Sequence, residues 1–279
     1  MEKKANINDS QHPPQANAIE PDLLGSAPNF RDLGGITTKS GLQLRHGVIY
    51  RSEVLDRLFS EDLKKFHAIG IGAVCDLRHG KERETRRIMW PRDTPPLSLG
   101  QPPSEGLEAV QSNTLLKRLN ADDFEAEEAM QVLRKAYRRM PTTLAPNLAD
   151  VLAHLAEGDG SPMLIHCTSG KDRSGFVCAM VLLSLDVPWQ TIVNDHMESK
   201  RRYPLTKIER ALAAALTSRL PPGRMAQLVD LATVHPSYLE ASIEEIEHQH
   251  GGANNYLKDM AGLTDTRRAA LQRRLLISA

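Results

Sequence analysis

One short stretch of the chain combines a nucleophile with a cation at a spacing suited to phosphate chemistry. Cys167 and Arg173 are separated by five residues within 165–175, which reads Ile-His-Cys-Thr-Ser-Gly-Lys-Asp-Arg-Ser-Gly. An arginine can hold two oxygens of a phosphoryl group with parallel donors. A thiol beside such cations and helix-terminal amides loses its proton more readily than usual. We therefore interpret the stretch as a phosphate-binding catalytic loop with Cys167 as its nucleophile.

The residues on either side of this loop predict that it joins a strand to a helix. Residues 162–165 form an apolar run suited to a buried strand, and residues 176–185 are apolar on nearly every side, as in a buried helix. The loop amides and the first helical turn would then point at one spot, where the helix dipole adds partial positive charge. An anion should bind in that cradle.

Two alternative interpretations of the loop are weaker. Gly-Lys at 170–171 could belong to a nucleotide-binding loop, but Asp172 stands where such a loop carries the serine or threonine that holds magnesium. No nucleotide, metal or other cofactor is therefore expected. A lone buried cysteine is usually an inert core residue, but the neighbours of Cys167 favour a reactive one. His166 should support the loop by a hydrogen bond, because neighbours on a strand point to opposite sides.

The composition excludes several classes of function. The 279 residues carry 35 basic and 35 acidic side chains, so the whole molecule offers no general attraction for nucleic acid or an anionic membrane. No window approaches the roughly eighteen apolar residues of a membrane helix, and the N-terminal residues lack an apolar signal segment. Three cysteines, an odd number, suit a reducing compartment. We expect a soluble cytoplasmic protein, with non-standard secretion left open.

The chain divides into a tail and one domain. Residues 1–24 are polar and proline-containing and should form a flexible tail, whereas 25–279 should form a single domain. Strands alternate with helices, which indicates an α/β fold with a mostly parallel sheet. The expected elements are a small hairpin leading into a strand at 47–52, a helix capped by Ser60 that ends before Gly70, and strands at 71–75 and 97–99.

Functional groups collect at the carboxyl ends of parallel strands. Arg51, Asp76 and Cys167 each follow or end a predicted strand. We therefore expect these three side chains to share one cleft.

The second half of the chain is mostly helical. Residues 108–158 should be helical with breaks near Asn120 and Pro141, and residues 195–234 with a break at 221–223. Short C-terminal helices should stop at the glycines 251–252 and 262. An apolar stripe at i, i+4 spacing within 195–234 either packs on the core or forms a mobile lid or lipid-facing surface. Its residues are Ile208, Leu212, Leu216 and Leu220.

Several motifs together resemble those of the atypical bacterial tyrosine phosphatases, a family with a secreted mycobacterial tyrosine/lipid phosphatase among its members. The loop at 166–175 reads His-Cys-x-x-Gly-Lys-Asp-Arg-Ser-Gly. Asn-Phe-Arg-Asp-Leu-Gly-Gly at 29–35, Tyr-Arg-Ser at 50–52 and Asp-Leu-Arg at 76–78 are similar to the other hallmarks and occur in the same order. Residues 235–276 resemble the helical tail of that family.

The resemblance implies a tyrosine-phosphatase-like domain, with a central mostly parallel sheet flanked by helices, a helical lid at about 195–234 and C-terminal helices. It implies metal-free hydrolysis of phosphoproteins, with dual or triple specificity, through a phosphocysteine on Cys167. A phosphoinositide or inositol-phosphate phosphatase and a non-catalytic phosphate-binding protein are the alternatives. The expected partner is a phosphorylated protein or phosphoinositide. The oligomeric state is not predicted.

By the same resemblance, Arg173 is the phosphate clamp and Lys171 a second charge in the loop. Ser174 matches a hydroxyl that hydrogen-bonds the sulfur and helps it leave. The residues expected to bind the substrate are Thr168, Ser169, Gly170, Lys171, Ser174, Arg51 and Asp76, with His166 in support.

Three aspartates compete for the role of general acid, which must protonate a poor leaving group. Asp172 matches the in-loop aspartate of the resembling family, and could instead stabilise the loop. Asp76 could be the acid or could orient a neighbouring arginine. Asp93 follows Trp90-Pro91-Arg92, similar to the Trp-Pro-Asp acid loop of other tyrosine phosphatases but with an inserted arginine. We expect Asp172.

Two further groups have open roles. Asn29, Arg31 and Asp32 could shape the floor of the cleft or form an Asx turn. Cys75 could protect Cys167 as a disulfide under oxidation. Cys178 should be inert in its buried helix.

Overall fold

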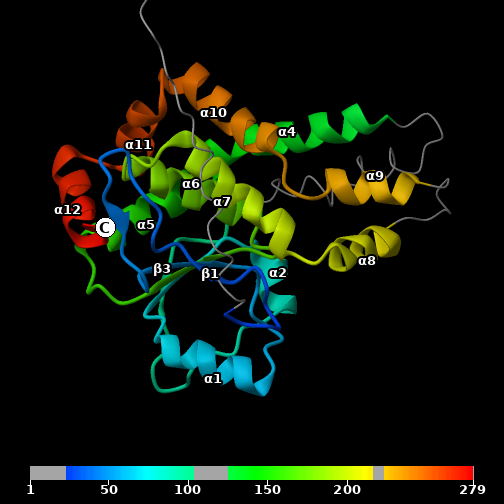
Figure 1. Cartoon of the computed structure of the whole chain (residues 1–279), viewed down its shortest axis with the longest axis horizontal. Helices are drawn as coiled ribbons and strands as arrows, with labels where there is room; N and C mark the ends of the chain where they lie inside the picture. Colours follow the sequence, from blue (N-terminus) through cyan, green and yellow to red (C-terminus); the bar gives the residue numbers. More distant parts are fainter. Residues whose placement is uncertain (1–22, 104–124, 216–222, 279) are drawn as a thin grey trace, which may run out of the picture.

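The computed structural model describes residues 23–103, 125–215 and 223–278, in which helices cover a central sheet (Figure 1). In these ranges the sheet has the strand order β1-β3-β6-β4-β5. The pairs β3–β6, β6–β4 and β4–β5 are parallel, and β1 runs antiparallel at the edge. The strands are β1 (Arg31–Asp32), β3 (Ile49–Ser52), β4 (Ala73–Asp76), β5 (Leu97–Leu99) and β6 (Met163–His166). The predicted mostly parallel sheet is confirmed.

The register aligns three strand ends beside the catalytic loop. Ser52 of β3 and Asp76 of β4 both pair with His166, the last residue of β6. All four residues of β6 are buried, because helices cover both faces of the sheet. The strand therefore reads as an unbroken apolar run before His166, which is why the sequence predicts it.

The helices lie on the two faces in unequal numbers. Of the helices in the described ranges, Figure 1 shows α1 on one side of the sheet and α4 to α7 and α10 on the other. The helices of the first half are α1 (Ser60–Ile69), α2 (Gly80–Thr85), α4 (Ala126–Thr143), α5 (Ala145–Glu157) and α6 (Arg173–Ser184). Those of the second half are α7 (Trp189–Arg202), α8 (Leu205–Ala215), α9 (Arg224–Leu231), α10 (Pro236–His250), α11 (Ala253–Ala261) and α12 (Asp265–Leu275).

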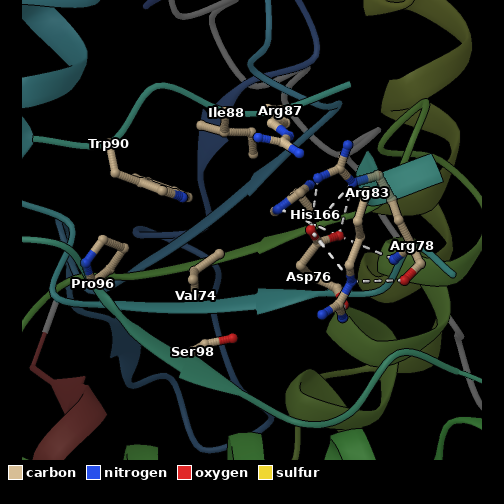
Figure 2. A pocket seen from close by; sticks show the side chains of 10 residues that line it. All are labelled: Val74, Asp76, Arg78, Arg83, Arg87, Ile88, Trp90, Pro96, Ser98 and His166. Atoms are coloured by element: carbon tan, nitrogen blue, oxygen red, sulfur yellow. Dashed lines mark hydrogen bonds and ion pairs between the residues drawn. The ribbon is translucent and has the colours of Figure 1, made fainter. Parts of the chain in front are cut away.

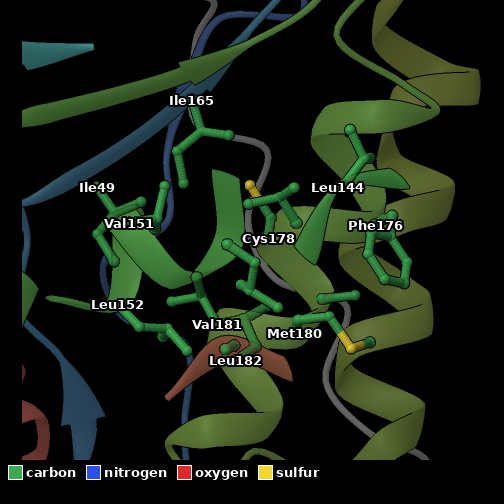
Figure 3. Close-up of a cluster of buried hydrophobic side chains, with 14 of the residues drawn as sticks. Ile49, Leu144, Val151, Leu152, Ile165, Phe176, Cys178, Met180, Val181 and Leu182 are labelled. Carbon is green, nitrogen blue, oxygen red and sulfur yellow. The ribbon is translucent and has the colours of Figure 1, made fainter. Parts of the chain in front are cut away.

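The larger hydrophobic cluster lies between the sheet and α5 and α6. In Figure 3, Ile49 and Ile165 from the strands gather with Val151 and Leu152 of α5 and with Val181 of α6. Each of these side chains is fully buried, and such burial stabilises a fold by roughly 1.5 to 3 kcal/mol per large apolar side chain. Helix α6 packs on all sides, which explains its uniformly apolar sequence.

A second cluster lies under α1, on the opposite face of the sheet. Phe30 stacks on Tyr50 with ring centroids 5.3 Å apart and meets the edge of Phe66 from α1 at 6.0 Å. Val74 and Leu164 contribute from β4 and β6. Because side chains alternate along a strand, even-numbered residues of these two strands face α1 and odd-numbered ones face α6. By the same alternation, the side chains of His166 and Cys167 lie on opposite faces of the sheet.

Two helix boundaries differ from the expectations. Ser60 is the first helical residue and Phe59 occupies the cap position, so the serine does not cap α1, although Gly70 does end it in the left-handed conformation. Helix α4 continues through Pro141 and ends only at Thr143, with Leu144 as its C-cap. The proline lies in the last turn, where its missing N–H costs a single hydrogen bond.

The helical segment expected at 195–234 is already interrupted at residues 203–204, before the break expected at 221–223. Helix α7 ends at Arg202 and α8 begins at Leu205, because Pro204 disfavours helix in the residue before it. Ile208 and Leu212 of α8 pack with Leu228 of α9 in a small third cluster beside α4. Asn120, Pro221, Leu216, Leu220 and residues 1–22 of the tail predicted at 1–24 lie outside the described residues. The end of that tail is predicted wrongly, because Leu24 is fully buried in the cluster under α1.

The C-terminal helices agree with the expectations. Gly251 and Gly262 end α10 and α11 in the left-handed conformation, and the side chain of Thr264 caps α12 by accepting from Arg267 N. The final strand β7 (Leu276–Ile277) pairs with β2 (Gln43–Leu44). No helix among the described residues is long and apolar enough to cross a membrane.

Candidate active site

The loop from Cys167 to Asp172 joins the end of β6 to the start of α6, as the sequence predicts. Cys167 is 2% exposed. The backbone N–H of Gly170 donates to its Sγ at 3.3 Å, and Ser174 Oγ lies 3.5 Å from the same sulfur. The loop therefore curls around the thiol, and the serine of the first helical turn is within reach of it.

Gly170 is the point at which the loop touches the end of β3. Its φ is +69°, and a Cβ at this position would lie 2.4 Å from the backbone N of Glu53 and 2.4 Å from the carbonyl carbon of Ser52. Contacts this short are with backbone and cannot be relieved by a side-chain rotation. Only glycine combines the left-handed conformation with this close approach.

Arg173, the expected phosphate clamp, is held by Glu82 of α2. Its two terminal nitrogens donate to the two carboxylate oxygens at 2.7 and 2.9 Å, and further to the carbonyl of Leu77 at 3.0 Å and to Thr168 Oγ1 at 3.2 Å. Burial would raise the pKa of Glu82, but the bonds from Arg173 and Thr168 outweigh it and lower the pKa to about 2. The pair is therefore ionised at neutral pH.

Glu82 is a site residue that the sequence analysis missed. It lies in a charged stretch where its neighbour Glu84 looks equivalent, but Glu84 is exposed. The one local signal is a capping box, because Glu82 Oε2 accepts from the backbone N–H of His79 at 3.1 Å. That pattern predicts a helix start and does not by itself indicate contact with the loop.

Arg51 lies beneath the loop and is fully buried. Its Nε donates to the carbonyl of Gly170 at 3.0 Å and its Nη2 to that of Lys171 at 2.8 Å, while Nη1 donates to Asp195 Oδ2 at 2.7 Å. Its side chain faces α6, so it satisfies loop carbonyls that would otherwise lack donors. These are the contacts of a positioning residue, in contrast to the substrate contact expected from the sequence.

Asp195 of α7 joins Arg51 to a second arginine. Arg31 Nε donates to Asp195 Oδ1 at 2.9 Å, and both arginines are buried. Burial would raise the pKa of Asp195, but Arg31 and Arg51 outweigh it and lower the pKa to about 2. The sequence offers no signal for this residue, because it lies 144 positions from Arg51.

The motif at 29–35 divides between the two roles left open for it. Asn29 Nδ2 donates to the carbonyl of Ser169 at 2.9 Å, and its Oδ1 accepts from Arg31 at 2.7 Å. These two residues support the loop. Asp32 instead accepts from the backbone N–H groups of Gly34 at 2.9 Å and Gly47 at 2.7 Å, which is the Asx-turn role.

Asp172, the preferred general acid, is bound on both sides. Tyr137 Oη donates to its Oδ1 at 2.8 Å, and Lys171 Nζ lies 3.2 Å from its Oδ2. Burial would raise the pKa of Asp172, but the charge of Lys171 and the bond from Tyr137 outweigh it, so the pKa is lowered. Lys171 also donates to the carbonyl of Ala232. Tyr137, on the distant helix α4, is a second residue that the sequence analysis missed.

The other two aspartates are placed differently. Asp76 pairs with Arg78 at 2.9 and 2.7 Å and lies 3.6 Å from His166 Nε2. It faces α1, whereas Cys167 packs with the residues that face α6, so the two do not share the cleft expected for them. This favours the ion-pair interpretation of Asp76. Asp93 is exposed in the segment between α2 and β5.

His166 is buried and points away from the thiol. Its Nδ1 lies 3.3 Å from the carbonyl oxygen of Cys167, which can only accept, so Nδ1 carries the proton. Burial lowers the pKa of His166 and outweighs the nearby charge of Asp76. The imidazole thus anchors the backbone of the loop.

All three cysteines are free and buried in the same cluster. Burial raises the pKa of Cys178 to about 12 and that of Cys75 still further. These two thiols therefore remain protonated, which suits core residues. Among the described residues, no group of three or more histidine, cysteine, aspartate or glutamate side chains could hold a metal ion.

Comparisons with known proteins agree with this geometry. The sequence profile of the tyrosine phosphatase family matches residues 23–277. A candidate tyrosine-protein phosphatase of Cupriavidus necator is 30% identical over 237 residues, which span 83% of this chain and 80% of that protein. The triple specificity protein phosphatase PtpB of Mycobacterium tuberculosis is 30% identical over 265 residues, which span 86% of this chain and 94% of that protein. The chain belongs to the tyrosine phosphatase family of enzymes.

Proposed function

We propose that this phosphatase hydrolyses phosphotyrosine through a phosphocysteine intermediate on Cys167. The observation that carries the proposal is the surroundings of the sulfur. Gly170 N–H and Ser174 Oγ lie at 3.3 and 3.5 Å from Sγ, and Arg173 begins the helix that follows. A phosphoryl group held by Arg173 and the loop amides would lie in front of the thiolate.

The reaction has two steps. The Cys167 thiolate attacks phosphorus, the S–P bond forms, and the bond to the tyrosine oxygen breaks as that oxygen takes a proton from the general acid. Water then attacks phosphorus and gives a proton to the general acid, which the first step left deprotonated. The S–P bond breaks, and the thiolate leaves with a hydrogen bond from Ser174 Oγ. Arg173 offsets the charge on the equatorial oxygens in both steps.

We assign the general acid to Asp172. Its carboxyl lies in the loop next to Arg173, and about a quarter of its side chain is exposed (27%). The lowered pKa makes it a carboxylate in the free enzyme. A bound phosphate dianion repels a second negative charge, so substrate binding raises the pKa of Asp172 toward the protonated form that an acid requires.

Paired alanine variants test the nucleophile. Cys167→Ala should abolish turnover of an aryl phosphate, whereas Cys178→Ala, which removes a buried thiol from the same cluster, should retain it. Turnover by Cys167→Ala at the wild-type rate would overturn the proposal. Trapping the intermediate by acid quench should give a phosphate mass on Cys167. Turnover unchanged by EDTA is the expected result if no metal takes part.

Phosphotyrosine is the preferred substrate class over phosphoinositides. Lys171, which would suit a multiply phosphorylated head group, is bound to the Ala232 carbonyl and to Asp172. In the basic run at 200–202, Lys200 pairs with Asp230 at 2.7 Å. The name of the M. tuberculosis relative includes triple specificity, so phosphoserine and phosphothreonine peptides belong in the same assay. Faster turnover of mono-phosphorylated phosphoinositides than of phosphotyrosine peptides would reverse this preference.

We infer that residues 25–279 form one phosphatase domain in which α8 and α9 act as a lid on the loop. Lys207 of α8 pairs at 2.9 Å with buried Glu53, which lies beside the loop. Lys171 of the loop donates to Ala232, the residue after α9. Both contacts must break for the lid to open. Limited proteolysis within α8 should be faster in Lys207→Met than in the unaltered protein.

We also infer a reducing compartment, such as the cytoplasm, because the proposed reaction needs a reduced Cys167. The disulfide between Cys75 and Cys167 stays a prediction for oxidising conditions. Intact-mass analysis after mild peroxide should give a loss of two hydrogens if it forms. Finding only oxygen additions would exclude it.

A further inference from the structure

A pocket of about 350 Å³ lies at the carboxyl ends of β4 and β5, on the face of the sheet that carries α1. Figure 2 shows two unlike halves of its wall. Trp90, Pro96, Val74 and Ile88 form an apolar half, and three arginines with His166 and Asp76 form a polar half. The proposed reaction uses none of the apolar residues.

The pocket carries excess positive charge. Arg78 is occupied by Asp76, and Arg83 donates through Nε to the carbonyl of Arg78 at 2.9 Å and through Nη2 to that of Asp76. Within the described ranges, Arg87 has no hydrogen-bond or ion-pair partner, although it lines the pocket and is exposed. The pocket is therefore lined by three guanidinium groups and one carboxylate, and a bound anion would balance the remaining positive charge.

His166 adds an unpartnered polar atom to the same wall. It is fully buried, and its Nε2 has no hydrogen-bond partner. Because Nδ1 donates to the Cys167 carbonyl, Nε2 is an acceptor, and it lies 3.6 Å from Asp76 Oδ1, a second acceptor. A ligand that carries a proton, such as a singly protonated phosphate, would donate at this point.

We propose that this pocket is a non-catalytic site for an aromatic ring that bears a phosphate or phosphonate group. The ring packs against Trp90 and Pro96, as planar groups do on aromatic and proline surfaces. The anionic group pairs with Arg87 and Arg83, and its acidic proton is donated to His166 Nε2.

The site is distinct from the catalytic loop. Val74 and Trp90 belong to the hydrophobic cluster on the α1 face, whereas Cys167 belongs to the cluster on the α6 face. Helix α2 lies between them: Glu82 reaches Arg173 on one side, and the next residue, Arg83, lines the pocket on the other. A ligand in the pocket therefore contacts the helix that holds the phosphate clamp without reaching the nucleophile.

Phenylphosphonate is a suitable probe, because it has no ester oxygen to cleave. The chain has two tryptophans, so Trp189→Phe leaves Trp90 as the single fluorophore. In this background, Trp90 fluorescence gives the dissociation constant of the pocket, and inhibition of aryl phosphate turnover gives that of the catalytic loop. Arg87→Gln should weaken pocket binding about tenfold or more and change the inhibition constant less than about twofold. Arg92→Gln, an exposed arginine of the same segment outside the pocket, should change neither.

Two results would overturn the proposal. One is a Trp90 signal that does not change at concentrations of phenylphosphonate that inhibit turnover, and the other is equal pocket binding by Arg87→Gln and Arg92→Gln. A third titration uses inorganic phosphate, which should bind the pocket about fivefold more weakly than phenylphosphonate because it lacks the ring. Equal affinity for the two probes would reject the aromatic part of the ligand.

Discussion

Glu82 holds Arg173 through both oxygens of its carboxylate, at 2.7 and 2.9 Å. The two residues come from α2 and α6, which lie 91 positions apart in the chain. Both side chains are largely buried, 13% and 14% exposed. A planar carboxylate facing a planar guanidinium fixes the orientation of the latter. Together with the bonds to Leu77 and Thr168 it uses the four terminal N–H groups, so the Nε–H of Arg173 keeps one direction before substrate arrives.

Replacing Glu82 with glutamine should lower kcat/KM about tenfold to a hundredfold, or about 1.4 to 2.7 kcal/mol of transition-state stabilisation. Glutamine keeps the shape but offers one acceptor and no charge, so Arg173 loses its fixed orientation. Steady-state turnover of an aryl phosphate measures the effect. Glu84→Gln, an exposed residue of the same helix, is the control and should behave as wild type. A rise in kcat/KM of Glu82→Gln would mean that Glu82 competes with phosphate for the arginine.

Most of the fold follows from patterns that are local in the sequence. The ends of the strand before Cys167 are predicted to within one residue, and those of the helix after it to within three. Both predictions succeed because burial on all sides requires unbroken apolar runs. The stops at Gly251 and Gly262 are predicted because a left-handed residue favours glycine. Tyr203-Pro204 was missed as a break, since a helical period continues on both sides of it.

The site is predicted less completely, for a physical reason. Cys167 begins the loop and Arg173 is the first residue of the helix that follows it, so their spacing alone indicates the chemistry. Glu82, Tyr137 and Asp195 act on that loop from three separate helices, and their contacts exist only once the chain has folded. A carboxylate or phenol in an amphipathic helix looks the same in sequence whether it faces solvent or a buried arginine.

Replacing Gly170 with alanine should abolish most activity, by about a hundredfold or more, and destabilise the protein. The added Cβ would lie 2.4 Å from backbone atoms of Glu53 and Ser52, so the loop must move away from β3. Gly41→Ala is a matched control, because its φ of +84° is equally unfavourable but no atom lies within 4 Å of the new Cβ. It should cost about 1 kcal/mol in unfolding free energy and leave kcat/KM unchanged. Urea unfolding and steady-state kinetics compare the two, and equal activity of both variants would refute the close approach at Gly170.

Replacing Tyr137 with phenylalanine should shift the pH dependence of kcat. The phenol donates to Asp172 and stabilises its carboxylate form, so removing it raises the pKa of Asp172. A general acid must be protonated in the enzyme–substrate complex, so the descending alkaline limb of kcat should move to higher pH. Tyr256→Phe, which loses only a bond to the Pro141 carbonyl, is the control and should leave the limb in place. If the alkaline limb of kcat lies at the same pH in Tyr137→Phe as in wild type, Asp172 is not the general acid.

Asp195 makes stability depend on pH in a defined window. Its pKa is about 2 in the folded protein, below the ordinary value of about 3.9, so its stabilisation is present above pH 4 and is lost as the pH falls from about 4 to 2. The shift corresponds to about 3 kcal/mol. Asp195→Asn leaves Arg31 and Arg51 buried without their counter-charge and should cost about 3 to 5 kcal/mol at pH 7. Urea unfolding should show that the difference in unfolding free energy between wild type and Asp195→Asn narrows by about 3 kcal/mol as the pH falls from about 4 to 2. Asp230→Asn, which removes the carboxylate of an exposed ion pair, should stay close to wild type throughout. A difference independent of pH would show that the charge of Asp195 does not stabilise the folded state.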